Sequence, residues 1–213
     1  VRDEANGSIV EHNRLYNSPA AAINGGGFEK KWRYNEIFDC VKESSDAGAI
    51  YLGRNSKDRG TEISYNYIHD IYGEYGLDYA FFCGVYLDDF EAGIDVQNNV
   101  FKNVSTPIYG HHAMQNNITG NLIINKTADT NGSIWWTSGA GYRSMIDDTS
   151  NAGGTFWQRH SMFDWTKEPY ASRYPEAKEL TLDNALYPVG NVIKNNVIVN
   201  HTSLNIAKEV YEY

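Results

Sequence analysis

The sequence predicts an all-β fold: a single-stranded, right-handed parallel β-helix with coils of about 22 residues. Two observations predict it, namely an asparagine-centred motif that occurs six times and a second short apolar segment that follows each copy. In both segments apolar residues alternate with polar ones, and Gly, Asn or Asp separate the segments, which is typical of strands and bends. A unit this short cannot bury its own apolar face, but stacked units share one continuous core.

The repeated motif has the pattern apolar-x-x-Asn-x-apolar-x-(Asn or Asp). Its anchors are Asn13, Asn35, Asn66, Asn99, Asn121 and Asn196. The smallest step between anchors is 22 residues, so the longer steps are expected to contain inserted loops. An asparagine at one fixed point of each coil can hydrogen-bond to the coils on either side, and it tolerates the backbone angles of a bend. We therefore expect the six anchors to line up from coil to coil.

The second segment of each repeat predicts two outward columns of side chains. Its central residues, expected to face inward, are Ile23, Ile50, Val85, Ile108 and Ile134. The next residue of each coil then faces outward, giving a column of Asn24, Tyr51, Tyr86, Tyr109 and Trp135. Two residues further on, a second outward column contains Gly26, Gly53, Asp88, His111 and Thr137, flanked by Arg54, Asp89 and His112.

Residues 139–190 interrupt the repeat and are rich in aromatic residues. We expect them to form an irregular insertion packed on the side of the solenoid, within a single domain that spans residues 1–213. The chain begins at Val1 without an initiator Met or a signal segment, so we expect a fragment or processed form of a longer protein.

Composition excludes several classes of function. The net charge is -9 and no basic block interrupts the acidic background, which argues against nucleic-acid binding. Apolar runs are far shorter than the roughly 20 residues that a membrane-spanning helix needs. Cys40 and Cys83 could form one disulfide or remain two buried thiols, and Cys83, two residues before Val85, is expected to face inward.

The outward columns combine aromatic rings with charged groups, a combination that suits a carbohydrate ligand. The candidate substrate-binding residues are Tyr51, Arg54, Tyr86, Tyr109, His111, His112 and Trp135. On adjacent coils, Asp88 is expected to couple to His111, and Asp89 to Arg54 and His112. The aromatic column has a second interpretation, because stacked tyrosines also stabilise solenoids without binding anything.

Seven stretches carry a resemblance to a known family: Ser45-Asp46-Ala47-Gly48-Ala49-Ile50-Tyr51, Gly53-Arg54, Gly60-Thr61-Glu62-Ile63, Asn66-Tyr67-Ile68-His69-Asp70, Gly84-Val85-Tyr86-Leu87-Asp88-Asp89, Arg173-Tyr174-Pro175-Glu176 and Pro188-Val189-Gly190-Asn191. They resemble secreted bacterial right-handed β-helix proteins of glycoside hydrolase family 141. The resemblance implies a glycoside hydrolase with Asp46, Asp88 and Asp89 as catalytic residues, of which Asp88 is the main candidate in the tandem pair. It also implies a carbohydrate substrate, no cofactor or metal, and a secreted or periplasmic location.

Two alternatives remain open. A pectate-lyase-like polysaccharide lyase would hold Ca²⁺ on Asp46, Asp88 and Asp89, although its face would offer chiefly Arg54, Lys57 and Arg59 to bind uronate carboxylates. The other alternative is a non-catalytic glycan-binding β-helix. In a straight strand Asp46 and Asp88 would lie about 23 Å apart, so the hydrolase requires a bend near Asp46.

Overall fold

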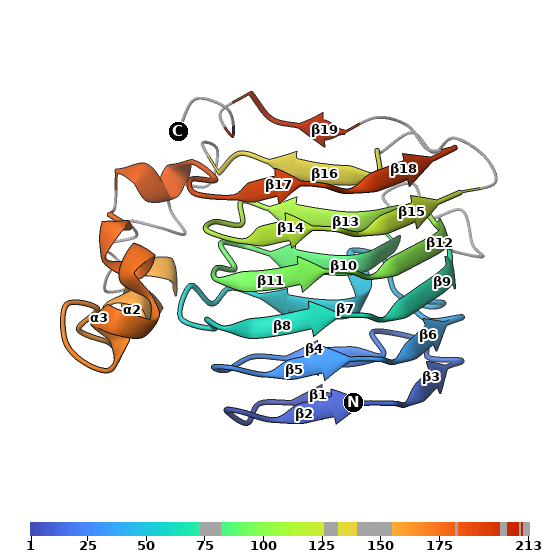
Figure 1. The fold of residues 1–213 in the computed structure, drawn as a ribbon, viewed down its shortest axis with the longest axis horizontal. Coiled ribbons are helices and arrows are strands. Elements are labelled where there is room, and N and C mark those ends of the chain that lie inside the picture. The colour runs from blue at the N-terminus through green and yellow to red at the C-terminus, as the bar shows by residue number, and fades with distance from the viewer. Residues whose placement is uncertain are drawn as a thin grey trace.

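The computed structural model describes residues 1–72, 82–125, 132–139, 155–181, 183–200, 204–208 and 210. Most of the regular structure is strand, arranged as three parallel sheets that run along a stack of coils (Figure 1). The strands β1, β2 and β3 form one end of the stack, and β17, β18 and β19 form the other. An all-β fold built from parallel strands is therefore confirmed, in the form of a solenoid.

Each sheet takes one strand from every coil. The first sheet contains β1 (Arg2–Asp3), β4 (Ile23–Gly25), β7 (Ala47–Gly53), β10 (Phe82–Asp88), β13 (Thr106–His111), β16 (Ile134–Thr137) and β19 (Asn205–Ile206). The second contains β2 (Ile9–Glu11), β5 (Lys31–Arg33), β8 (Thr61–Ser64), β11 (Ile94–Gln97), β14 (Asn117–Thr119) and β17 (Val192–Lys194). The third contains β3 (Arg14–Tyr16), β6 (Glu36–Phe38), β9 (Tyr67–Ile71), β12 (Val100–Val104), β15 (Leu122–Ile124) and β18 (Val197–Val199).

The predicted coil length is confirmed where no loop is inserted. Arg14 lies opposite Glu36, 22 residues later, and their side chains form an ion pair across the coils. The five central residues of the second segments face the core as predicted, and all are fully buried. Stacking the coils thus creates the continuous apolar interior that no single coil could provide.

The six anchor asparagines line up between the second and third sheets. The side-chain oxygen of Asn66 accepts hydrogen bonds from the backbone N–H of Asn35, at 3.0 Å, and from the Asn35 amide, at 3.1 Å. The Asn66 amide in turn donates to the oxygen of Asn99 and to the carbonyl of Trp32. The same pattern runs from Asn13 to Asn196. Every buried amide inside the row therefore has its donors and its acceptor satisfied by neighbouring coils.

The residue before each anchor adopts the left-handed backbone conformation. These residues are His12, Tyr34, Tyr65, Asn98, Gly120 and Asn195. The left-handed residue and the anchor together form the two-residue bend that turns the chain from the second sheet into the third. Three of the left-handed residues stack outside the coil, with ring centroids 5.1 Å apart between His12 and Tyr34 and between Tyr34 and Tyr65. This stacking offsets part of the cost of a positive φ in residues other than glycine.

The insertion leaves the solenoid between β16 and β17, and its residues 140–154 and 182 lie outside the described residues. The remainder forms helices α2 (Thr155–His160) and α3 (Tyr170–Arg173) and the 3₁₀ turns η2 (Pro175–Glu179) and η3 (Asn184–Leu186) beside the stack (Figure 1). Phe156 and Leu180 pack against Phe90 and Met114 of the coils. Within the described ranges, no helix has both the length and the apolar character needed to cross a bilayer.

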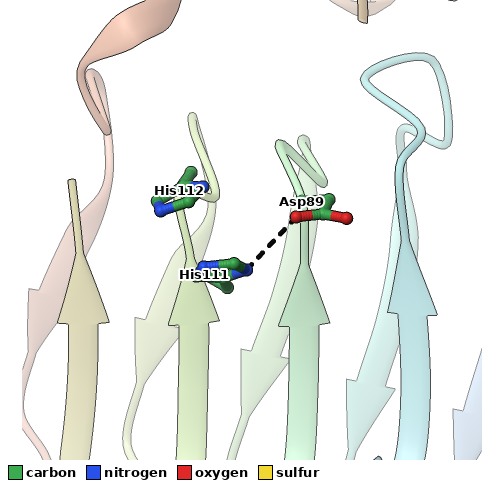
Figure 2. Close-up of side chains that lie close together, drawn as sticks. All are labelled: Asp89, His111 and His112. Atoms are coloured by element: carbon green, nitrogen blue, oxygen red, sulfur yellow. Dashed lines mark ion pairs between the residues drawn. The ribbon is translucent and has the colours of Figure 1, made fainter. Parts of the chain in front are cut away.

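Parallel strands end at the same edge of a sheet, and this geometry brings charged groups together at the end of the first sheet. Asp89 follows β10, while His111 ends β13 and His112 follows it (Figure 2). Neighbouring strands hold Asp89 beside the two histidines, although it lies more than 20 positions before them in the sequence.

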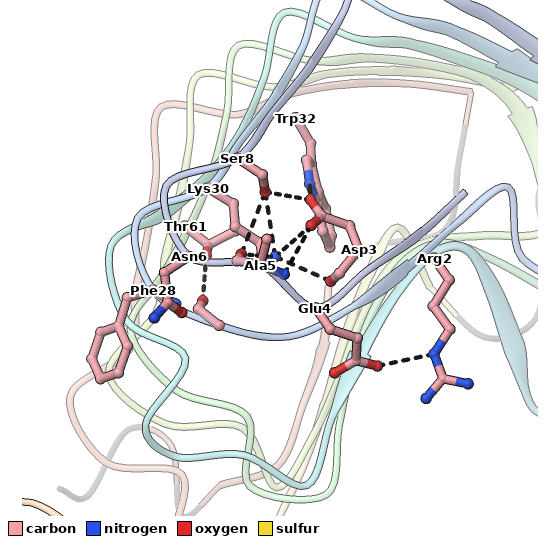
Figure 3. A network of polar contacts seen from close by, with 11 residues as sticks. Arg2, Asp3, Glu4, Ala5, Asn6, Ser8, Phe28, Lys30, Trp32 and Thr61 are labelled. Atoms are coloured by element: carbon pink, nitrogen blue, oxygen red, sulfur yellow. Dashed lines mark hydrogen bonds and ion pairs between the residues drawn. The ribbon is translucent and has the colours of Figure 1, made fainter.

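A buried ion pair stabilises the first coil. Lys30 is fully buried and donates to the carboxylate of Asp3 at 2.9 Å, and the indole N–H of Trp32 donates to the other carboxylate oxygen at 2.9 Å (Figure 3). Burial raises the pKa of Asp3, but hydrogen bonds from Ser8, Lys30 and Trp32 outweigh it and hold the pKa at about 2. Asp3 therefore stays ionised and compensates the buried ammonium group.

Removing an anchor amide from the middle of the row should destabilise the fold. In Asn99→Ala, the N–H groups of Asn66 and the carbonyl of Ile63 lose buried partners, so we expect the free energy of unfolding to fall by about 3 kcal/mol. Urea unfolding followed by circular dichroism measures this change. The control is Asn117→Ala on the exposed surface, expected to stay within about 0.5 kcal/mol of the parent. Equal shifts for the two variants would contradict a stabilising role for the row.

The pKa of Asp3 predicts an acid-sensitive contribution to stability. Because its folded-state pKa of about 2 lies below the ordinary value of 3.8, the contribution is complete above pH 4 and is lost as the pH falls through 2. The difference in unfolding free energy between the parent and Asp3→Asn should therefore be about 2 kcal/mol smaller at pH 2 than at pH 6. Urea titrations at both pH values test this, and a pH-independent difference would refute it.

Candidate functional site

The outward column of the first sheet has the predicted register. Tyr51 lies opposite Tyr86, Tyr86 opposite Tyr109, and Tyr109 opposite Trp135. Asn24 continues the column opposite Tyr51. The column therefore crosses five successive coils on the outer wall of the solenoid.

The rings in the middle of this column are buried against one another. Tyr86 and Tyr109 stack with centroids 4.7 Å apart, and Tyr109 and Trp135 stack at 4.3 Å. Tyr86 is 2% exposed and Tyr109 is 3% exposed, whereas Tyr51 and Trp135 are half-buried. The column is thus a stacked ladder, and only its outer members offer ring surface to a ligand.

Cys83 does not face inward as the alternation predicts. It is buried, but it packs against Tyr86 and Tyr109 on the outer side of the strand. The cause lies at Gly84, where an added Cβ would come within 2.9 Å of the core residue Phe101, so that Gly84 and Val85 both face the interior. Because two consecutive residues face inward, the inward and outward positions are exchanged in the part of the strand that precedes them, and Cys83 faces outward. Cys83 and Cys40 are both free thiols.

A network of charged groups surrounds Asp88 and Asp89. His111 donates from Nδ1 to Asp88 at 2.8 Å and lies 3.2 Å from an oxygen of Asp89. The Tyr51 hydroxyl donates to the other oxygen of Asp88 at 2.6 Å, and Arg54 donates to Asp89 at 2.6 Å. The expected couplings of Asp88 to His111 and of Asp89 to Arg54 are confirmed.

The network gives neighbouring histidines opposite protonation behaviour. Burial lowers the pKa of His111, but hydrogen bonds and charges from Asp88 and Asp89 outweigh it and raise the pKa to about 9. Burial and the positive charge of His111 lower the pKa of His112 to about 4. For Asp89, burial raises the pKa, and the hydrogen bonds from His111 and Arg54 lower it below the ordinary value. At neutral pH the network thus contains a charged His111 and a neutral His112.

Asp46 reaches the same outer wall from the start of β7. It is exposed, has a left-handed backbone with φ of 53°, and accepts a hydrogen bond from the Tyr86 hydroxyl at 2.9 Å. Tyr51 lies opposite Tyr86, and along an extended strand the five residue steps from Asp46 to Tyr51 would span about 16 Å. The left-handed backbone at Asp46 and the reach of the Tyr86 side chain together bridge this distance. After burial, the charges of Asp88 and then Asp46 raise the pKa of Tyr86, so both carboxylates act on one phenol.

The glycines beside Asp88 do not open an empty cleft at this position. A Cβ added to Gly53 would lie 3.0 Å from the Cβ of Asp88 and 3.1 Å from the Tyr51 hydroxyl. Gly53 therefore provides the room in which Tyr51 and Asp88 meet. A polar cleft of 380 Å³ lies elsewhere, where the insertion meets the second sheet, and Asp95 and Glu176 are among its lining residues.

Sequence reasoning missed the burial of three charged residues, Asp58, Arg59 and Glu91. Asp58 is buried, and burial raises its pKa to about 6. Glu91 is fully buried, and burial together with the charge of Asp58 raises its pKa well above the ordinary value. Arg59, also fully buried, bonds to Glu176 and Gln115. No local pattern marks these residues, because their burial depends on the insertion that packs over the corner.

Three of the site residues could hold a metal ion. Asp89, His111 and His112 each offer one ligand atom, and these atoms all lie within 4.8 Å of one another (Figure 2). Two imidazoles and one carboxylate form a donor set that transition metals favour.

Comparison with family models, with curated proteins and with solved structures finds no match to this chain.

Proposed function

We propose that this chain is a glycoside hydrolase that acts on a polysaccharide or oligosaccharide, with Asp46 and Asp88 as its two reacting carboxyl groups. The observation that carries the proposal is the contact of each carboxylate with a tyrosine hydroxyl of the neighbouring coil on one outer wall. The resemblance to glycoside hydrolase family 141, with its right-handed β-helix and secreted location, supports the same activity.

The two carboxyl groups have environments that suit different roles. Both oxygens of Asp88 accept hydrogen bonds, one from Tyr51 and one from His111, as expected of a carboxylate acting as nucleophile or general base. Asp46 is exposed and contacts Tyr86, so it can approach the glycosidic oxygen of a bound sugar. We assign Asp46 as the general acid and Asp88 as the nucleophile or base.

In the proposed reaction, Asp46 gives its proton to the leaving glycosidic oxygen as the bond to the anomeric carbon breaks. The hydroxyl of one water molecule ends on the anomeric carbon, and the remaining proton of that water restores the acid. In one route Asp88 forms an ester bond to the anomeric carbon, and water then breaks that bond while Asp46 takes the water's proton. In the other route Asp88 itself removes the proton from the attacking water, and proton exchange with solvent returns both carboxyl groups to their starting states. Enzymes that use the ester route hold their two carboxyl groups about 5 to 5.5 Å apart, and enzymes that use the direct water route hold them about 6.5 to 9.5 Å apart.

Substrate contacts are assigned to the accessible members of the wall. Arg54, whose side chain is 59% exposed, and the half-buried rings of Tyr51 and Trp135 can contact sugar hydroxyls and faces. Tyr86, Tyr109, His111 and His112 are assigned to support them from below.

The lyase alternative has less support. Arg59, one of the three cations expected to bind uronate carboxylates, is buried and paired with Glu176. A purely glycan-binding role has less support too, because the centre of its aromatic platform is buried.

The test is hydrolysis of a panel of plant cell-wall glycans, measured as released reducing sugar. Asp88→Asn and Asp46→Asn should each lower turnover by about 10²- to 10⁴-fold, because each removes one proton-transfer or nucleophilic group. The matched control is Asp39→Asn. Asp39 has a similar left-handed backbone, but it follows β6 of the third sheet and its carboxylate pairs with Lys42, so this variant should keep full activity.

Undiminished turnover in both active-site variants would eliminate the hydrolase. Products with a new ultraviolet-absorbing double bond would instead identify a lyase. Glycan retention by the parent without any product would identify a binding protein.

A further inference from the structure

Asp89, His111 and His112 come together because the chain bends sharply at two points. In an extended strand, His111 and His112 would face opposite sides of the sheet. His112 instead has a left-handed backbone with φ of 57°, and its ring centroid lies 3.7 Å from that of His111. Asp89 also has a positive φ, of 38°, directly after β10. The two bends turn three ligand-bearing side chains toward a common point.

The spacing of these groups fits a metal ion. Nδ1 of His111 lies 3.2 Å from an oxygen of Asp89. Two ligands of one tetrahedral Zn²⁺, each about 2 Å from the ion, lie about 3.3 Å apart. The third ligand atom, from His112, is within 4.8 Å of the other two, so a small inward shift of that ring completes the set.

The charges around the three side chains also favour a cation. Asp88 and Asp89 bring two carboxylates to His111, and Arg54 bonds the Asp89 oxygen Oδ2 while Oδ1 faces His111. A divalent ion could take the place of the proton on His111, with Arg54 orienting Asp89 from behind. The His112 ring is buried beside that of His111, so the protein rather than bulk water surrounds both imidazoles.

We propose that Asp89, His111 and His112 form a binding site for a divalent transition-metal ion, for which Zn²⁺ is the best fit. Imidazole ligands select Zn²⁺ and its neighbours over Ca²⁺ and Mg²⁺, which prefer an all-oxygen shell. Three protein ligands leave one coordination position for water or a sugar hydroxyl. This inference does not depend on the proposed hydrolase, because binding is measured without turnover.

The test is calorimetric titration of the chelator-treated full chain with Zn²⁺. The parent should bind one ion per chain at micromolar concentration or below, and its melting temperature should rise with Zn²⁺. His112→Ala and Asp89→Asn should each weaken binding at least about tenfold. The matched control is His69→Gln, because His69 also contacts carboxylates, those of Asp70 and Glu36, but is not part of the three-residue cluster. Its binding should equal that of the parent.

Absence of binding by the parent, or unchanged binding in both His112→Ala and Asp89→Asn, would overturn the proposal. Should either variant fail to fold, Co²⁺ added to the parent decides the question. Tetrahedrally bound Co²⁺ gives a visible absorption band, which should disappear when Zn²⁺ replaces the Co²⁺. Absence of this band would also overturn the site. Absence of Zn²⁺ binding by the parent while it still hydrolyses glycans would refute only the metal site. Zn²⁺ binding by a parent that hydrolyses no glycan would refute only the hydrolase.

Discussion

The row of buried asparagines between the second and third sheets is the constraint on which the rest of the structure depends. Each amide inside the row accepts hydrogen bonds from the asparagine of the coil before it. It donates to the asparagine of the coil after it and to a backbone carbonyl of the coil before it. A buried amide that lost these partners would carry a large desolvation cost, so a slip of one residue in any coil is strongly disfavoured. The row therefore fixes the register of all three sheets.

Fixed register is what assembles the site on the first sheet. Asp88 and His111 belong to strands β10 and β13, and they meet because each coil repeats the position of the one before it. The same repetition stacks Tyr86 on Tyr109 and Tyr109 on Trp135. Since the core and the asparagine row set the backbone positions, the charged side chains are held in place before any ligand binds. Such preorganisation is what a catalytic or metal-binding group requires.

Burial gives this wall its particular chemistry. Tyr51 and Tyr86 place their hydroxyls on two different aspartates, and Asp88 and Asp89 share one imidazole. In a partly dry environment these interactions are stronger than they would be in water. The pKa values of His111 and His112 shift in opposite directions in that same environment. Burial lowers both, but the two carboxylates raise the pKa of His111, whereas the charge of His111 lowers that of His112 further. Adjacent residues of one sequence thus acquire different protonation states.

The sequence by itself determined the repeat, the coil length, the row of asparagines and the order of side chains along the outer wall. These features depend on local alternation and on spacing, which survive wherever strands are regular. Only the tertiary structure decided how Asp46 reaches Tyr86, how His112 turns toward His111, and why Cys83 faces outward. Each of these depends on a left-handed residue or on a break in alternation, and such bends in residues other than glycine carry no distinctive local pattern. The burial of Glu91 and Arg59 likewise follows from packing between distant segments, because the insertion covers the corner of the solenoid where they lie. The residues next to Glu91 and Arg59 in the sequence give no sign of this cover.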